Sequence, residues 1–372
     1  MPRVARFLTQ ASALSEGRSR RLRLSLALTA MLLLVVAAAP PAYAASQPST
    51  VVSLPTPFAF PTALTTTQDG SVWFAESGKI GRVGPPPSRT VTEFPLPAGH
   101  SAKSITIGPD GNLWFTEPAA GRIGRITPSS GAVTEFPLAG NSAYGTPVNR
   151  PQSITTGPDG KLWFTQTIFS RQGVRTVGSK IASLDTNGTF QASFTLPSGN
   201  TKSTTTVADA IVATPGFLWF TDTQQGRIDQ ITTGGVLTTH QFQYGSPTGL
   251  VVGSDGALWF PASFFGPGGS SLARMSLSGD FSRSAFTIDG QNGASVGAIA
   301  AGADGTIWFA DYDMTSSAGS IFSRSVKTGA MTRYTFSVYK EIDGLGARPD
   351  GTVWFGETDN QSGQSLIGRI TP

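Results

Sequence analysis

Seven Trp-Phe pairs recur along the sequence, and they limit what this chain can fold into. They stand at 73–74, 114–115, 163–164, 219–220, 259–260, 308–309 and 354–355, and the chain has no tryptophan outside them. Successive pairs are 40 to 56 residues apart. A period in this range is typical of repeat architectures, in which each repeat is one small supersecondary unit. The repeat therefore has to be interpreted before any single residue.

Each repeat has the pattern of a small antiparallel sheet. Six of the seven pairs follow an Asp-Gly dipeptide, and the fourth follows Pro215-Gly216. Asp-Gly between two apolar runs indicates a hairpin turn, because both residues tolerate positive φ. In the second repeat the runs cover 104–107, 113–116, 122–127 and 132–138. Leu113, Trp114 and Phe115 are consecutive in the second run, so this strand is apolar on both faces and is expected to be covered on both sides.

Four short strands per repeat, packed face to face with their neighbours, predict an all-β fold: a seven-bladed β-propeller with four antiparallel strands per blade. The seventh repeat ends after its third strand, while the segment 50–55 ahead of the first repeat resembles the fourth-strand segment 90–97. We therefore expect the N-terminal strand, Val51–Leu54, to pair with Leu366–Ile370. This pairing closes the ring and leaves no open sheet edge.

Residues 1–44 have the pattern of a secretory signal peptide rather than of a blade. Several arginines precede an apolar run at 24–39, and Ala42-Tyr43-Ala44 follows as a small-residue cleavage site. The run is about 16 residues long, shorter than the ~20 that a membrane-spanning helix needs. We expect cleavage after Ala44, one propeller domain over 45–372, and a secreted or cell-envelope protein. An uncleaved membrane anchor is the alternative.

Charge and composition exclude several classes of protein. The chain has 27 basic and 23 acidic residues, of which six and one lie in 1–44, so that 45–372 holds 21 and 22. A segment without excess positive charge is not expected to bind nucleic acid or, after signal cleavage, a membrane. The absence of cysteine excludes disulfides, thiolate catalysis and cysteine zinc sites. We expect a monomer whose ligand is a small molecule, a glycan or a peptide.

Insertions in the longer repeats share one position, between the second and third strands. They cover 166–180, 261–271, 313–320 and 359–365. This connection lies on the same ring face as the links between blades, opposite the Asp-Gly hairpins, so we expect a binding site on the loop-rich face. Four aromatic residues of the insertions are candidates for lining an apolar or sugar-binding groove: Phe169, Phe264, Phe265 and Tyr312. The alternative is that they fix the long loops to the propeller.

Blade seven concentrates carboxylates on that face. Glu341 and Asp343 precede its first strand and Glu357 ends its second. Oxygen ligands of this kind suit Mg²⁺ or Ca²⁺, and ordinary solvated loop acids are the alternative. An acidic or amide residue two positions after Trp-Phe recurs in six of the seven repeats, which favours a structural role at that position. The two histidines, His100 and His240, are expected on the surface near fourth strands or blade links.

The run Gly-Pro-Asp-Gly-x-Leu-Trp-Phe-Thr-Glu at 108–117, followed by Ile-Gly-Arg-Ile-Thr at 123–127, resembles the streptogramin B lyase (virginiamycin B lyase) family of seven-bladed propellers. The Trp-Phe repeats extend the resemblance over 45–372. It implies a magnesium-dependent lyase that opens a cyclic depsipeptide antibiotic, breaking an ester C–O bond by elimination. In the family a histidine of a Glu-Pro-His-Gly-Ile segment is the base. Metal ligands come from that Glu, from a Glu after Trp-Phe and from a histidine one blade earlier.

The best match to this segment is Glu-Ile-Asp-Gly-Leu at 341–345. The resemblance thus makes Glu341 and Glu357 magnesium ligands and places Asp343 at the base position, while the earlier histidine position falls on Gly297. An aspartate with a pKa near 3.9 is a weaker base at neutral pH than an imidazole near 6.5. Our first expectation is therefore a secreted, lyase-like propeller that binds an unidentified ligand on its loop-rich face. The alternatives are a divergent magnesium-dependent carbon–oxygen lyase and a cell-envelope interaction scaffold.

Overall fold

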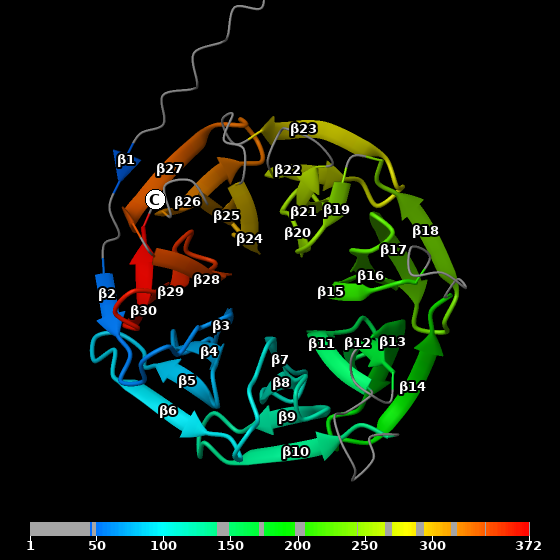
Figure 1. Ribbon diagram of the computed structural model, residues 1–372, viewed down its shortest axis with the longest axis horizontal. Helices are drawn as coiled ribbons and strands as arrows, with labels where there is room; N and C mark the ends of the chain where they lie inside the picture. Colours follow the sequence, from blue (N-terminus) through cyan, green and yellow to red (C-terminus); the bar gives the residue numbers. More distant parts are fainter. Residues whose placement is uncertain are drawn as a thin grey trace, which may run out of the picture. The chain divides into compact units, whose positions relative to one another are not determined.

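A computed structural model describes residues 45–46, 50–139, 149–170, 175–197, 205–243, 245–264, 270–287, 294–313, 318–338 and 340–371. The predicted signal peptide, residues 1–44, lies outside this part of the chain. The described residues form strands and turns, and no helix among them is long and apolar enough to span a membrane. Seven sheets follow one another around a ring (Figure 1), which confirms the predicted seven-bladed all-β propeller.

The first four blades each contain four antiparallel strands in simple up-and-down order. From the ring axis outward, the strands of blade one are β3 (Ala63–Thr66), β4 (Val72–Glu76), β5 (Lys79–Val83) and β6 (Val91–Pro95). Those of blade two are β7 (Ile105–Ile107), β8 (Leu113–Glu117), β9 (Arg122–Ile126) and β10 (Val133–Pro137). Those of blade three are β11 (Asn149–Thr156), β12 (Leu162–Phe169), β13 (Thr176–Leu184) and β14 (Phe190–Thr195). Those of blade four are β15 (Ala208–Thr214), β16 (Phe217–Asp222), β17 (Arg227–Thr232) and β18 (Leu237–Gln241).

The last three blades vary this plan. In blade five the innermost strand is divided, and the strands are β19 (Gly245–Pro247) with β20 (Val251–Val252), β21 (Leu258–Phe264), β22 (Ser270–Met275) and β23 (Phe281–Thr287). Those of blade six are β24 (Ala294–Ala301), β25 (Thr306–Asp313), β26 (Ala318–Ser325) and β27 (Met331–Val338), with β1 (Ala45–Ser46) added in parallel to β27. Those of blade seven are β28 (Lys340–Ala347), β29 (Val353–Asp359), β30 (Ser365–Ile370) and, from the other end of the chain, β2 (Thr50–Ser53).

The N-terminal strand closes the ring as predicted. β2 runs antiparallel to β30, with Val51 opposite Gly368 and Ser53 opposite Leu366. The contact continues past the strand, because the backbone N–H of Leu54 donates to the carbonyl of Ser365 at 2.9 Å. Blade seven therefore has its four strands, with the outermost supplied by the N-terminal end of the propeller segment.

The recurrent motif has a direct structural explanation. In blade two the indole Nε1 of Trp114 donates to Oδ1 of Asp110 at 3.1 Å, which ties the buried ring to the Asp-Gly turn. Where blade four lacks the aspartate, Thr214 takes its place and accepts from Trp219 at 3.0 Å. The Ile-Gly-Arg run on β9 is explained by Phe115, since a Cβ on Gly124 would lie 2.1 Å from the phenyl ring.

The core is a closed circle of Trp and Phe contacts between neighbouring blades. The two residues of each pair are adjacent on one strand, so their side chains point to opposite faces of the blade. Each buried Trp shares a cluster with the Phe of the next blade: Trp73 with Phe115, Trp114 with Phe164, Trp163 with Phe220, Trp219 with Phe260, Trp259 with Phe309, Trp308 with Phe355 and Trp354 with Phe74. The last contact joins blade seven to blade one.

Two features differ from the sequence expectation. β1 adds a strand to the outer edge of blade six, with Ala45 opposite Arg333 and Ser46 opposite Tyr334. The insertions also lengthen strands rather than forming only loops, because β12 runs to Phe169 and β25 to Asp313. Phe169 and Tyr312, expected in loops, therefore lie on strands.

Candidate functional site

The innermost strands carry an irregularity at one equivalent position on the loop-rich side. The register shifts between Pro151 and Ile154 in β11, and corresponding shifts occur in β15, β24 and β28. The residues at this position, which we call the axial slot, are Thr62, Lys103, Gln152, Asp209, Thr248, Gly297 and Asp343. A β-bulge redirects side chains and is frequent beside active sites. The same slot contains both positions at which the resemblance implies a histidine.

Blades two to four join their slot residues into a network. The Nζ of Lys103 donates to Oε1 of Gln152 at 2.7 Å and lies 3.1 Å from Oδ1 of Asp209, two blades away. Thr165, the residue that follows Trp-Phe in blade three, hydrogen-bonds to the backbone of the innermost strands of blades three and four. The hydroxyl of Thr165 accepts from the N–H of Ser153 at 3.1 Å and donates to the carbonyl of Asp209 at 2.6 Å. In this part of the ring the slot charges are paired.

Blade seven differs, because its slot residue is a half-buried acid bonded to a hydroxyl. The Oδ2 of Asp343 accepts a hydrogen bond from the hydroxyl of Thr358 at 2.7 Å. Thr358 is also 3.1 Å from the hydroxyl of Ser365, which accepts from the backbone N–H of Ala59 at 3.0 Å. Burial, followed by the charges of Glu341 and Glu357, raises the pKa of Asp343 to about 7, although the Thr358 bond lowers it. Asp343 thereby becomes a group able to exchange a proton near neutral pH.

The three predicted acids of blade seven lie on two faces of the sheet. Glu341 stands opposite Thr358 in the register, so that its side chain shares a face with Thr358 and Asp343. Glu341 is exposed and its Oε2 accepts from the amide of Asn360 at 3.2 Å. Glu357 precedes Thr358 on β29 and points to the other face, with Phe355 and towards blade six.

These faces decide how well the residues fit the magnesium site that the resemblance implies. Asp343 and Glu341 have oxygens on one side of the blade, Glu357 is on the other, and Gly297 supplies no ligand atom. The donors do not converge on one point, so these residues do not fit a magnesium ion held in the way of the family. Binding of magnesium by Glu341 and Glu357 stays a prediction. A Cβ atom at Gly297 would meet no heavy atom within 4 Å, so the backbone position itself has room for a residue larger than glycine.

The predicted aromatic residues are dispersed over three blades. Phe169 ends β12, and the guanidinium of Arg150 lies 4.2 Å from its ring centroid. Phe264 ends β21, while Phe265 is outside the described residues. Tyr312 lies on β25 opposite Ser295 and Gly319. A ligand-binding role for these four residues stays a prediction, and the Arg150 contact accounts for the position of Phe169 without a ligand.

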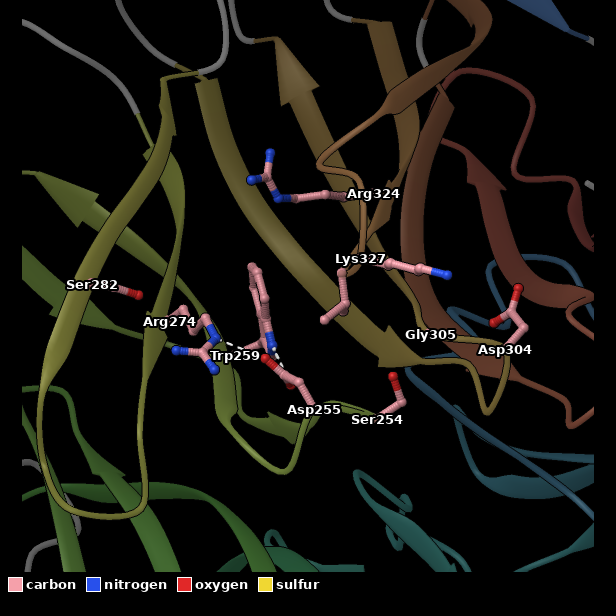
Figure 2. A pocket seen from close by; sticks show the side chains of 10 residues that line it. Ser254, Asp255, Trp259, Arg274, Ser282, Asp304, Gly305, Arg324 and Lys327 are labelled. Carbon is pink, nitrogen blue, oxygen red and sulfur yellow. Dashed lines mark hydrogen bonds and ion pairs between the residues drawn. The ribbon is translucent and has the colours of Figure 1, made fainter.

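A pocket of about 590 Å³ lies between blades five and six (Figure 2). It is formed at the Asp-Gly hairpins, opposite the face that carries the long connections. Asp255 accepts from Trp259 at 3.2 Å and from Arg274 at 2.7 Å, while Arg324 lies 5.9 Å from the Trp259 ring centroid. Asp255 and Arg274 thus bond to each other and to the buried Trp259.

Both histidines were expected on the surface, and the structure corrects this. His240 on β18 packs against Trp219, with ring centroids 5.4 Å apart, at the place where blade two has Phe136 against Trp114. His100 is half-buried in the link between blades one and two, beside Glu117 and Glu135. Aligning the fourth strands would have shown that Glu93 and Glu135 are equivalent and that His240 stands where other blades have an aromatic ring.

Comparisons with known proteins agree with the seven-bladed propeller fold. The virginiamycin B lyase family pattern matches residues 44–259 and 145–372. Virginiamycin B lyase from Staphylococcus aureus has a similar structure, with a TM-score of 0.68 and 25% identity over 87% of this chain and 99% of that one. The structure of its catalytically inactive histidine-to-alanine variant with quinupristin has a TM-score of 0.67 and 26% identity, over 87% of this chain and 99% of that one. A streptogramin B lyase structure has a TM-score of 0.66 and 27% identity, over 86% of this chain and 97% of that one. No curated protein matches the sequence.

Proposed function

Because this chain belongs to the virginiamycin B lyase family, we propose that it is a carbon–oxygen lyase that uses Asp343 as its general base. Its substrate is a cyclic, ester-containing peptide bound on the loop-rich face. Ligand binding on that face, the first expectation from the sequence, is the first step of this activity. The resemblance supplies the reaction class, and the environment of Asp343 supplies the argument for this particular chain.

The observation that carries the proposal is the position of Asp343. It stands on the bulge of β28, in the slot where the family has its base, and Thr358 fixes the carboxylate by a 2.7 Å hydrogen bond. The sequence-based objection to activity assumed an ordinary aspartate. A half-buried carboxyl whose pKa is raised to about 7 by burial works in the range in which an imidazole would work.

The reaction can be written with this carboxylate alone as base. Asp343 removes the proton from the carbon next to a carbonyl group of the substrate. The electron pair of that C–H bond forms a C=C bond to the neighbouring carbon. The ester C–O bond on the neighbouring carbon breaks, and the carboxylate leaves with its electron pair. No water is consumed, and the proton on Asp343 passes to solvent or to the leaving carboxylate.

The substrate class is supported by the relatives and by the chemistry of the slot. Quinupristin is the ligand of the catalytically inactive relative, so a compound of this type is the appropriate first probe. The Lys103, Gln152 and Asp209 network offers amide and charged groups to a polar peptide ring. The proposal also includes export through the signal peptide 1–44 and action as a monomer.

Chromatography with mass detection tests the proposal. Quinupristin is incubated with the purified protein, with and without Mg²⁺. Elimination gives a product of unchanged mass and altered retention, whereas hydrolysis would add one water. Asp343→Asn should remove the activity, since loss of a general base typically costs about 10²–10⁴-fold. Glu76→Gln, a buried acid at another blade, should leave it unchanged.

The outcomes separate the candidate functions. Conversion that survives Asp343→Asn, or a product heavier by one water, would refute the assignment of Asp343 or the elimination. Binding of quinupristin without conversion would favour the ligand-binding propeller, which the paired Lys103 network supports as the second candidate. Neither binding nor conversion would leave the interaction scaffold as the better description.

A further inference from the structure

Three side chains with metal-ligating atoms meet between blades one and two, away from Asp343. They are His100, Glu117 and Glu135, and one ligand atom of each lies within 4.8 Å of the others. The Nδ1 of His100 is 2.9 Å from Oε1 of Glu135 and 3.5 Å from Oε2 of Glu117. It is the one such group among the residues that the structure describes.

Three separate segments bring the group together. Glu117 ends β8 on the same face as Leu113 and Phe115, which pack against blade one. Glu135 stands on β10 opposite Gly124, in the same cross-strand row as Phe115. His100 belongs to the link that follows β6 and reaches over the end of blade two. The position is therefore fixed by the interface between the two blades.

The protein balances the negative charge of this group at Glu135 but not at Glu117. Glu117 is fully buried, and neither of its oxygens has a hydrogen-bond partner among the described residues. The Nη1 of Arg122 lies 3.4 Å from Oε2 of Glu135, on the side of that carboxylate away from His100. A buried carboxylate without a partner is costly, and a bound cation removes that cost.

Blade one contains the corresponding pair of glutamates, with a lysine bound to the one on the fourth strand. Glu76 and Glu93 correspond to Glu117 and Glu135, since they end β4 and stand on β6 at matching positions. There Lys79 binds both Glu93 and Thr56 through its ammonium group. In blade two the residue at the lysine position is Arg122, and the link residue is His100 instead of a threonine. The guanidinium of Arg122 thus takes the place of the lysine ammonium beside Glu135, and blade two adds the imidazole of His100 on the other oxygen of this carboxylate.

We propose that His100, Glu117 and Glu135 bind a zinc ion between blades one and two. Zinc takes histidine nitrogen at about 2.0–2.1 Å and carboxylate oxygen at about 2.0–2.2 Å, usually in tetrahedral sites. Such bonds separate neighbouring ligand atoms by about 3.4 Å. The 3.5 Å and 2.9 Å separations seen here require only a small movement of His100 away from Glu135.

The surrounding residues suit this ion. Two carboxylates neutralise its two charges, and Arg122 holds the outer oxygen of Glu135, which leaves the inner oxygen directed at the metal. Three protein ligands leave the fourth coordination position for water. The bound ion would link the connection after β6 to the second and fourth strands of blade two. It would stabilise the blade interface and take no part in the chemistry at Asp343.

Calorimetric titration of the chelator-treated full protein with zinc chloride tests the inference. We expect one ion per chain and a rise in the unfolding temperature with zinc. Glu117→Gln and His100→Ala should each weaken binding by more than about 10-fold, because even outer-shell partners of a metal contribute about 10–100-fold. Cobalt(II) in place of zinc should give visible absorption bands that both variants lose.

Matched controls separate this site from others. Glu76→Gln, the blade-one counterpart of Glu117→Gln, should bind zinc as the unaltered protein does, and so should Glu341→Gln. Glu117→Gln keeps the shape of the side chain and removes a buried charge, so it should fold even if His100→Ala does not. Absence of stoichiometric binding, or binding that Glu117→Gln leaves intact, would overturn the proposal. Neither result depends on lyase activity.

Discussion

Glu76 should make the protein less stable as the pH rises, and replacing it with glutamine should remove that effect. Its side chain is 1% exposed, and neither carboxylate oxygen has a hydrogen-bond partner among the described residues. Burial, followed by the charge of Glu93, raises its pKa from 4.5 to about 8. The folded state therefore holds the proton more tightly than the unfolded state. The resulting stability is fully present below about pH 4.5 and is lost as the pH rises through about 8.

The magnitude follows from the two pKa values. One pKa unit corresponds to about 1.4 kcal/mol, so a rise from 4.5 to about 8 corresponds to a ceiling of about 5 kcal/mol. Water that reaches the ionised group lowers this, and we expect about 2–4 kcal/mol at pH 9. Glutamine resembles the neutral carboxyl, so Glu76→Gln should match the unaltered protein near pH 4.5 and exceed it at pH 9.

Urea unfolding followed by tryptophan fluorescence measures this difference, because every tryptophan lies at a blade interface. The comparison is made at pH 4.5, 7 and 9, with the exposed Glu341→Gln as control. If Glu76→Gln were no more stabilising at pH 9 than at pH 4.5, the charged form of Glu76 would have to be paired in the fold. The argument from its buried, unbonded oxygens would then be refuted.

Four further predictions concern closure, the slot, the base and export. Deleting 45–56 should lower the free energy of unfolding by several kcal/mol, because it removes β2 from blade seven; unchanged denaturant midpoints would contradict closure. Thr165→Val should cost about 1–3 kcal/mol in the same assay, since the N–H of Ser153 and the carbonyl of Asp209 lose their shared hydroxyl. The lyase rate should rise with pH through about 7, as Asp343 loses its proton, and a rate that is flat from pH 5 to 9 would exclude it as base. Mass spectrometry of the exported protein should find Ala45 at its N-terminus, and an intact residue 1–44 segment would exclude cleavage.

The fold could be predicted from the sequence because the residues that specify each blade are close together in the chain and recur in every repeat. The adjacent Trp and Phe of one strand point to opposite faces, and both are buried only if sheets stack on both sides. The Asp-Gly turn and the missing last strand then determined blade order and closure. The two-residue strand β1 could not be foreseen, because its pairing with β27 has no repeated pattern.

The site was predictable only in part. Matching the segment 341–345 located Asp343, but its raised pKa depends on burial, and its carboxylate is held by Thr358, fifteen residues away and on another strand. Glu357 looked like a partner of Glu341, yet strand alternation sends the two side chains to opposite faces. His100 was missed because its partners come from two other strands of the next blade. Contacts of this kind depend on packing rather than on spacing.

The closing strand also sets the order of events when the protein is made. Ala59 and Ser365, which bond to each other beside β2, are 306 positions apart, so the N-terminal segment cannot pair until almost the entire chain has been synthesised. Until then β2 and the edge of the unfinished seventh sheet are both available to other chains. A polypeptide stopped before β30 would possess six complete sheets and no means of sealing the circle. Ring closure therefore depends on completion of the C-terminal strand β30. Truncated products should aggregate rather than persist as smaller propellers.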